Sequence, residues 1–196
     1  MVGAGQHGCW LGSYEKVHIA QIVPLIHSGM IAFDVGAHSG YYTLLLSRLV
    51  GNGGKVIAFE ASRLNADNLR RHLEINRVCN VEVVEAAVTD RAGTAHFHDE
   101  SYLSKLSKTG RVVQTVRLDD FGVPDFIKID IEGAETLALN GAKNILKAVK
   151  TTWFLALHEE ASECPDMLMR NGYSIKWTSP CDLIAAPNKA ASRMGQ

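Results

Sequence analysis

A glycine-containing turn lies between the first strongly apolar run of the sequence and a segment with helical spacing. The turn reads Asp34-Val35-Gly36-Ala37-His38-Ser39-Gly40, and the helical segment begins near Tyr41. Glycines in such a turn let the backbone approach a ligand closely, and the first N–H groups of a helix provide free donors and positive potential. The turn therefore predicts a ligand site at the end of the preceding strand.

An acidic residue follows the second apolar run, where Phe59 is succeeded by Glu60, 24 residues after Gly36. An acid at this place is positioned to accept hydrogen bonds from both hydroxyls of a ribose. The turn and Glu60 together predict a ligand that contains a nucleoside. A purely structural alternative stays open, in which the glycines serve a tight strand–helix junction and Glu60 is an N-terminal helix acid beside Ser62.

The turn differs from the dinucleotide fingerprint G-x-G-x-x-G, whose middle glycine admits a pyrophosphate. Here the spacing is G-x-x-x-G, with His38 where extra bulk would crowd that group. The carboxylate of Asp34 would repel phosphates and attract a sulfonium or ammonium group. These features favour S-adenosylmethionine over NAD. An NAD-dependent oxidoreductase is the less favoured alternative.

A second cluster of charged residues follows a later apolar run, in Lys128-Ile129-Asp130-Ile131-Glu132-Gly133-Ala134-Glu135. Crowding three carboxylates and a lysine at one strand end is unfavourable unless these groups have a function. A further pair, His158-Glu159, follows the next apolar run. Asp130 and His158 are the candidate catalytic residues, since a histidine can accept a hydroxyl proton near neutral pH. Asp130 is alternatively a partner for the ammonium group of the cofactor.

Those same strand ends could bring Asp130, Glu132, His158 and Glu159 together around a divalent ion. Carboxylates at strand ends are not sufficient for that assignment, so the sequence assigns no metal ligands.

The elements that must position these residues alternate along the chain. Short apolar runs with the character of buried parallel strands are Ile31–Val35, Lys55–Phe59, Val81–Val84, Phe126–Ile129 and Thr152–Leu157. Segments with helical spacing are Tyr14–His27, Tyr41–Val50, Leu64–Asn76 and Ala134–Val149. Such alternation predicts an α/β domain with right-handed crossovers.

Two regions depart from this alternation. The stretches Thr94–His98 and Val112–Leu118 predict an added antiparallel pair. Near the end, Tyr173–Trp177 and Asp182–Ala185 are separated by Ser179-Pro180, and strands so close together must be antiparallel.

Composition restricts the functional class. The 196 residues carry a formal net charge of −1, so there is no bulk basic excess to indicate nucleic-acid binding. No apolar stretch is long enough to span a membrane, and the N-terminal residues lack the pattern of a signal peptide. The four cysteines form no C-x-x-C pair, which favours reduced thiols. We expect a cytoplasmic protein, and the sequence leaves the oligomeric state open.

At these motifs the sequence resembles the FkbM family of S-adenosylmethionine-dependent methyltransferases. The resemblance rests on Trp10, Tyr14-Glu15, the run from Asp34 to Thr43, Phe59-Glu60, Leu118-Asp119-Asp120 and the block from Lys128 to Glu135. It implies a Rossmann-like class I methyltransferase fold: a three-layer sandwich with a mostly parallel seven-stranded sheet and an antiparallel C-terminal strand. It also implies methylation of a hydroxyl on a sugar, glycolipid or secondary metabolite.

The resemblance further implies roles for individual residues. Asp34, Gly36 and the backbone of Ala37, His38, Ser39 and Gly40 would hold the methionine part of the cofactor. Glu60 would bind the ribose, and Ala61 with Ala86 would flank the adenine. Family members usually carry asparagine in place of His38, a departure that backbone contacts would tolerate.

The expected organisation is an N-terminal segment and helix over residues 1–30, a methyltransferase domain over 31–187 and a flexible tail over 188–196. The expected partner is a small-molecule or glycan acceptor. A non-catalytic module that binds S-adenosylmethionine without a working acceptor site is the alternative from another functional class.

Overall fold

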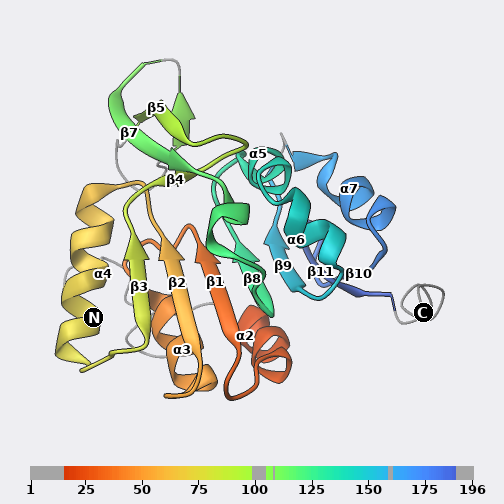
Figure 1. The fold of residues 1–196 in the computed structure, drawn as a ribbon, viewed down its shortest axis with the longest axis horizontal. Helices are drawn as coiled ribbons and strands as arrows, with labels where there is room; N and C mark the ends of the chain where they lie inside the picture. The colour runs from red at the N-terminus through yellow and green to blue at the C-terminus, as the bar shows by residue number, and fades with distance from the viewer. Residues whose placement is uncertain (1–15, 99–104, 108, 159–160, 189–196) are drawn as a thin grey trace.

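The computed structural model describes residues 16–98, 105–107, 109–158 and 161–188. Its main feature is a seven-stranded sheet with the order β10-β11-β9-β8-β1-β2-β3 (Figure 1). The strands are β1 (Ile31–Val35), β2 (Lys55–Phe59), β3 (Val81–Val84), β8 (Phe126–Ile129), β9 (Thr152–Ala156), β10 (Tyr173–Trp177) and β11 (Asp182–Pro187). Neighbours from β3 to β9 are parallel, and β11 is antiparallel to both β9 and β10. The predicted sheet with its reversed C-terminal strand is confirmed.

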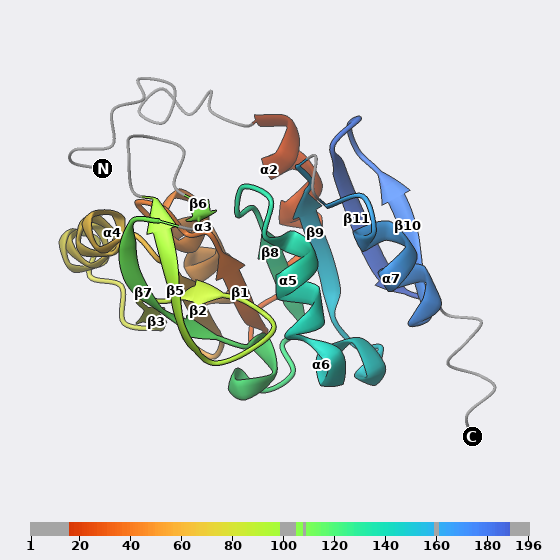
Figure 2. The same ribbon diagram turned by 90° about the horizontal axis from the view of Figure 1, so that it is seen from above.

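Helices cover both faces of this sheet, as Figure 2 shows. One face packs against α2 (Lys16–Ile22), α3 (Tyr41–Val50) and α4 (Arg63–Ile75). The other packs against α5 (Glu135–Asn140), α6 (Lys143–Ala148) and α7 (Cys164–Arg170). Side chains of a strand point alternately to the two faces, so both faces of each central strand must be apolar. The predicted three-layer sandwich follows from this burial on two sides.

Two charged residues interrupt the apolar central strands. All four residues of β8 are buried, including Lys128, and Asp34 in β1 is also buried. Buried charges are costly unless they are paired, so their presence in the middle of the sheet points to a specific role.

A smaller sheet lies beyond the ends of β2 and β3, with the order β4-β7-β5-β6 (Figure 1). It consists of β4 (Ala87–Val88), β5 (Gly93–His98), β6 (Lys105–Ser107) and β7 (Arg111–Val116). The predicted antiparallel pair corresponds to β5 and β7, but the two short strands β4 and β6 were not predicted. Two- and three-residue strands leave almost no periodic signal in a sequence.

The helix predicted over Ala134–Val149 is wrong in its continuity, because α5 and α6 are separate helices. The break occurs at Gly141, where an added Cβ atom would lie 2.1 Å from the carbonyl oxygen of Thr89. Glycine lets the backbone after β4 pack directly against this position, and the Gly141 carbonyl oxygen accepts the N–H of Asp119 from η2 (Leu118–Phe121).

The helix predicted over Tyr14–His27 is also shorter within the described residues. Helix α2 ends at Ile22 and continues as the 3-10 turn η1 (Val23–Leu25), which contains Pro24. A proline cannot donate the backbone hydrogen bond that a continuing α-helix requires. The predicted start at Tyr14 lies outside the described residues, as does the predicted tail over residues 188–196 except for Asn188.

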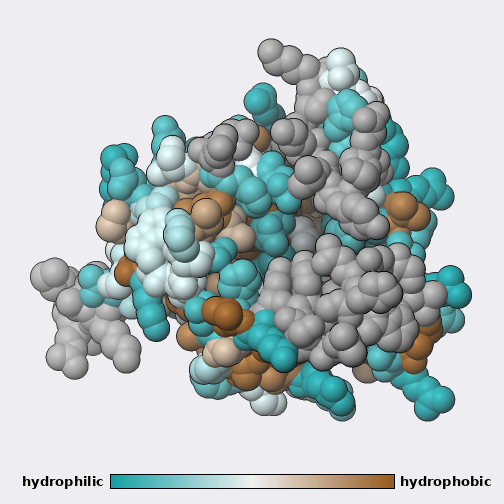
Figure 3. All heavy atoms as spheres, turned by 180° about the vertical axis from the view of Figure 1, so that it is seen from behind, coloured by the Kyte–Doolittle hydropathy of each residue, from teal (hydrophilic) through white to brown (hydrophobic). Residues whose placement is uncertain are grey.

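The surface of the described residues mixes hydrophilic and hydrophobic side chains on the face shown in Figure 3. Single exposed apolar residues such as Val17, Leu64 and Trp177 are normal on soluble folds and do not by themselves mark a partner. None of the described helices has the length and apolar character needed to cross a membrane.

Asp119 connects two segments of the chain that are distant in the sequence. It lies in the 3-10 turn η2 (Leu118–Phe121), and its carboxylate accepts hydrogen bonds from the backbone N–H groups of Asn144 and Ile145 at 3.0 and 3.1 Å. These N–H groups belong to the first turn of α6, so Asp119 caps this helix from a distant part of the chain.

We predict that Asp119→Ala lowers the free energy of unfolding by about 1–2 kcal/mol, as loss of a helix cap does. Urea denaturation measures the change. Asp120→Ala is the matched control, because this exposed neighbour pairs with Arg117 at the surface. Equal effects of the two substitutions would contradict the capping role.

Candidate functional site

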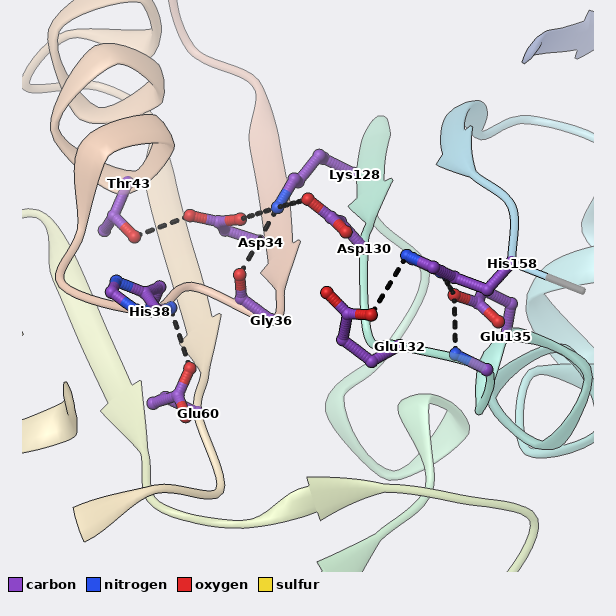
Figure 4. A network of polar contacts seen from close by, with 11 residues as sticks. Asp34, Gly36, His38, Thr43, Glu60, Lys128, Asp130, Glu132, Glu135 and His158 are labelled. Carbon is purple, nitrogen blue, oxygen red and sulfur yellow. Dashed lines mark hydrogen bonds and ion pairs between the residues drawn. The ribbon is translucent and has the colours of Figure 1, made fainter. Parts of the chain in front are cut away.

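The candidate site lies where four parallel strands end. Because β1, β2, β8 and β9 run in the same direction, the residues that follow them gather at one edge of the sheet (Figure 4). In the register of β1 and β8, Asp34 lies directly beside Lys128. The two clusters recognised in the sequence therefore form one continuous site.

The ammonium group of Lys128 connects these strand ends. Its Nζ atom lies 3.7 Å from Oδ1 of Asp34 and 3.5 Å from Oδ2 of Asp130, and donates to the carbonyl oxygen of Gly36 at 3.3 Å. Asp34 also accepts a hydrogen bond from the hydroxyl of Thr43 at 2.6 Å. Burial raises the pKa of Asp34, and the charge of Lys128 and the Thr43 hydrogen bond oppose this effect only in part.

The turn after β1 is tightly fitted to its neighbours. Gly36 has a φ of +79°, and a Cβ atom there would lie 1.9 Å from the carbonyl oxygen of Asp130. Gly40 has a φ of +95°, and its Cβ would lie 2.4 Å from Leu69. Gly36 therefore requires glycine for conformation and for space, because its neighbour is backbone. Gly40 favours glycine for its positive φ, since the side chain of Leu69 can shift. His38 also has a positive φ, +49°, a region that histidine and asparagine enter more readily than most residues.

Glu60 joins this turn to the end of β2. One carboxylate oxygen accepts the N–H of His38 at 2.7 Å, and the other accepts the N–H of Ser62 at 2.8 Å. Burial raises the pKa of this carboxyl group, and the two backbone hydrogen bonds counteract the shift in part. The side chain of Asn65 also hydrogen-bonds this carboxylate, so three of its roughly four lone-pair sites are used within the protein. Glu60 thus braces the junction, as the structural alternative expected, and can still accept a hydrogen bond from a ligand.

Ala61 follows β2, and Ala86 follows β3. Ala86 is buried, whereas Ala61 is half-buried and packs against the apolar cluster of Ala87, Phe97 and Val113. The small sheet also contacts Ala61 through Arg111, whose guanidinium donates to the Ala61 carbonyl oxygen at 3.1 Å.

A second group of polar side chains extends the site beyond Lys128. Glu132 follows β8 in a left-handed conformation with φ +48°, and its Oε2 lies 3.3 Å from Nε2 of His158. The other ring nitrogen of His158, Nδ1, lies 2.6 Å from Oε1 of Glu135, which is fully buried at the start of α5. Oε1 of Glu135 also accepts the backbone N–H of Gly133 at 3.2 Å. Glu159 lies outside the described residues.

These contacts shift the pKa of His158. Burial disfavours the imidazolium, but the hydrogen bond to Glu135 and the charges of Glu135, Glu132 and Asp130 together raise the pKa of His158 above its ordinary value. The imidazole therefore lies between two carboxylates, one buried and one half-exposed, as Figure 4 shows.

The sequence grouped Lys128 and Glu135 with the strand-end charges but assigned them no role. Lys128 is the cation between Asp34 and Asp130. Glu135 orients His158, which follows the strand β9. Thr43 was noted only as part of a motif. The polar residues inside an otherwise apolar run were the available signal, since such residues are rarely buried without a partner.

A family model described as the methyltransferase FkbM domain matches residues 34–175, more than half of the chain. No curated protein gives a significant match to the sequence.

Solved structures share the fold. A methyltransferase FkbM from Methylobacillus flagellatus has a TM-score of 0.61 at 20% identity; the match covers 82% of this chain and 44% of that one, so this chain spans less than half of that protein. Fibrillarin from Aeropyrum pernix, solved with natively bound S-adenosyl-L-methionine, has a TM-score of 0.55 at 16% identity, covering 87% and 73%. A SAM-dependent O-methyltransferase from Thermotoga maritima has a TM-score of 0.54 at 16% identity, covering 87% and 63%.

The close fit of Gly36 gives a prediction about the turn. Gly36→Ala must move the turn away from the Asp130 carbonyl group and adopt a strained φ, so we predict a loss of at least about 3 kcal/mol in unfolding free energy. Gly29→Ala is the control, because Gly29 has a φ of +88° but no atom of another described residue, apart from its chain neighbours, within 4 Å of its added Cβ. The control should cost about 1–2 kcal/mol, from conformation alone. Urea denaturation of both variants measures the difference, and equal losses would contradict a tightly packed turn.

Proposed function

The chain belongs to the FkbM methyltransferase family, and on this basis we propose that it transfers a methyl group from S-adenosylmethionine to a hydroxyl oxygen. The acceptor class we propose is a sugar, glycolipid or secondary metabolite, hence a small-molecule or glycan partner. The described cysteines, Cys79, Cys164 and Cys181, are free thiols, which supports a reducing, cytoplasmic location.

One observation supports this proposal most strongly: the glycine turn and Glu60 are built as one unit at the carboxyl edge of the sheet. The His38 N–H binds Glu60 at 2.7 Å, so the acid is fixed beside the turn that precedes α3. Such an acid suits the two hydroxyls of a ribose. Ala61 follows Glu60 in the chain, and Ala86 follows β3, whose Val84 carbonyl oxygen accepts the Glu60 N–H at 3.0 Å. We assign both alanines to the adenine ring.

The methionine part of the cofactor fits the other half of the site. Lys128 is buried and pairs with Asp34, Asp130 and the Gly36 carbonyl oxygen, so its role is to position these groups around the ligand. Asp130, whose side chain is 36% exposed, suits the ammonium group of the methionine moiety. The backbone from Gly36 to Gly40 lies between these groups and Glu60. Asp34 is fully buried and acts through Lys128 and Thr43, which it holds in place.

The chemistry requires little more than alignment and removal of a proton. The cofactor, when bound, supplies a methyl group that is already activated as part of a sulfonium. The protein must hold the acceptor oxygen in line with that methyl group, which can lower the barrier by several kcal/mol. We propose Asp130 and His158 as the catalytic residues, with Asp130 fixing the methyl donor and His158 assisting loss of the hydroxyl proton.

Binding of S-adenosylhomocysteine tests the cofactor assignment without knowledge of the acceptor. We predict that Glu60→Gln weakens binding about 10- to 100-fold in isothermal titration calorimetry, since hydrogen bonds to a charged group contribute about 1.5–3 kcal/mol. His38→Asn is the matched control, because its backbone N–H remains and asparagine tolerates a positive φ. It should change the affinity less than about threefold. NAD binding in place of S-adenosylhomocysteine would contradict the assignment.

The raised pKa of Glu60 predicts a pH dependence of this binding. Protonation removes the acceptor capacity of one oxygen, so affinity should fall as the pH drops through a value above the ordinary 4.5 of a glutamate. Glu60→Gln cannot titrate, and its affinity should therefore lose this acid-side dependence. Comparison of the two proteins by calorimetry cancels the titration of the ligand itself. Parallel pH profiles would show that Glu60 does not contact the ligand.

Transfer of labelled methyl groups tests the activity. Radiolabelled S-adenosylmethionine is incubated with panels of sugars, glycolipids and hydroxylated metabolites. We predict incorporation into at least one hydroxyl acceptor and a loss of about 100-fold or more for His158→Gln. Cofactor binding without transfer to any hydroxyl acceptor would instead support a non-catalytic binding module.

A further inference from the structure

The strand-end cluster contains three side chains whose donor atoms converge. One ligand atom each from Asp130, Glu132 and His158 lies within 4.8 Å of the other two. The aspartate and glutamate follow β8 and the histidine follows β9, so adjacent strands bring the three together (Figure 4). Two carboxylates and one imidazole form a donor set for a divalent cation, and three protein ligands leave positions for water or for a substrate oxygen.

A separate residue supports a cation at this place. Glu135 does not belong to the converging set, but its fully buried carboxylate lies 2.6 Å from Nδ1 of His158. A histidine that donates Nδ1–H to a carboxylate presents the lone pair of Nε2, and metal-ligating histidines commonly have such a partner. In His158 it is Nε2 that faces Glu132, on the side of the converging atoms.

The charge of the cluster is also uncompensated. The other carboxylate oxygen of Glu135, Oε2, is buried and has no hydrogen-bond partner among the described residues. Both ion pairs that Glu132 and Glu135 form within the described part of the chain are with the same imidazole. Asp130 shares the single charge of Lys128 with Asp34. Three carboxylates thus surround His158, and one imidazolium charge cannot neutralise them.

We propose that Asp130, Glu132 and Nε2 of His158 form a binding site for a divalent cation of the Mn²⁺ or Mg²⁺ class. Oxygen-rich sites favour such ions, and the imidazole ligand favours Mn²⁺ over Mg²⁺. Glu135 is the positioning residue that orients His158. In the alternative, Nε2 of His158 carries a proton in place of the cation, and the imidazolium bridges Glu132 and Glu135.

This assignment deepens the proposed function and rests on it for its catalytic consequence. A cation at the site would bind the acceptor hydroxyl at an open position and lower the pKa of that hydroxyl. His158 would then act as a ligand through Nε2, and the proton of the cation-bound hydroxyl would pass to solvent water. Acceptors with two neighbouring hydroxyls would be favoured, because both oxygens can bind one ion.

Mn²⁺ binding tests the site without an acceptor. The full chain is treated with chelator, desalted and titrated with Mn²⁺ under electron paramagnetic resonance, with and without S-adenosylhomocysteine. We expect one saturable Mn²⁺ per chain. Glu132→Gln should weaken binding about 100-fold, and Glu135→Gln about 10- to 100-fold, as expected for an outer partner of a ligating histidine. Glu82→Gln removes an exposed charge of β3 and should leave the affinity unchanged.

Two results would overturn the inference: no saturable Mn²⁺ binding, or binding that all three variants retain, as for adventitious surface sites. Thermal unfolding of each variant verifies that it is folded, and the half-exposed position of Glu132 makes its substitution the milder one. S-adenosylhomocysteine binding without Mn²⁺ binding would overturn the cation site alone. Mn²⁺ binding without S-adenosylhomocysteine binding would overturn the cofactor assignment and leave the cation site in place.

Discussion

The ammonium group of Lys128 lies between the ends of two parallel strands, where it contacts the carboxylates of Asp34 and Asp130 and the carbonyl oxygen of Gly36. A buried charge is tolerated only when partners surround it, and removing one partner leaves the others uncompensated. The ends of β1 and β8 and the turn after β1 are therefore fixed relative to one another. The geometry on both sides of this contact, toward Glu60 and toward His158, depends on it.

The second feature that fixes the geometry of the site is the glycine in the turn after β1. The turn can approach β8 because Gly36 has no side chain, which places its backbone against the carbonyl group of Asp130. The same approach brings the His38 N–H to Glu60 at the end of β2. Residues that are far apart in the sequence thus form one polar edge, from the small sheet beside Ala61 to the start of α5. A nucleoside-containing cofactor and a hydroxyl acceptor can share such an edge, each bound by its own half.

The sequence predicted the main sheet well because its strands are short, continuous and apolar, and because parallel strands place their carboxyl ends together. It failed where packing between distant segments decides the outcome. The break between α5 and α6 depends on the contact of Gly141 with Thr89, which no local pattern reveals. The strands β4 and β6 are too short for a periodic signal.

The sequence predicted at which strand ends the site residues lie better than it predicted which of them contact one another. Asp34, Glu60, Asp130 and His158 were recognised as strand-end residues, and the structure places all four at one edge. The pairing of His158 with Glu135 connects β9 to α5 and could not be inferred from spacing, since two residues 23 apart meet only through the tertiary fold. Similarly, the sequence could not show that Lys128 rather than a ligand neutralises Asp34.

The most direct test is a crystal structure of the chain grown with S-adenosylhomocysteine. We expect the ribose hydroxyls within hydrogen-bond distance of Glu60 and the methionine ammonium group beside Asp130. We also expect the sulfur to point toward the space between Asp130 and His158. Density for the ligand at another place, or with its ribose away from Glu60, would contradict the assignment of this edge as the methyl-donor site.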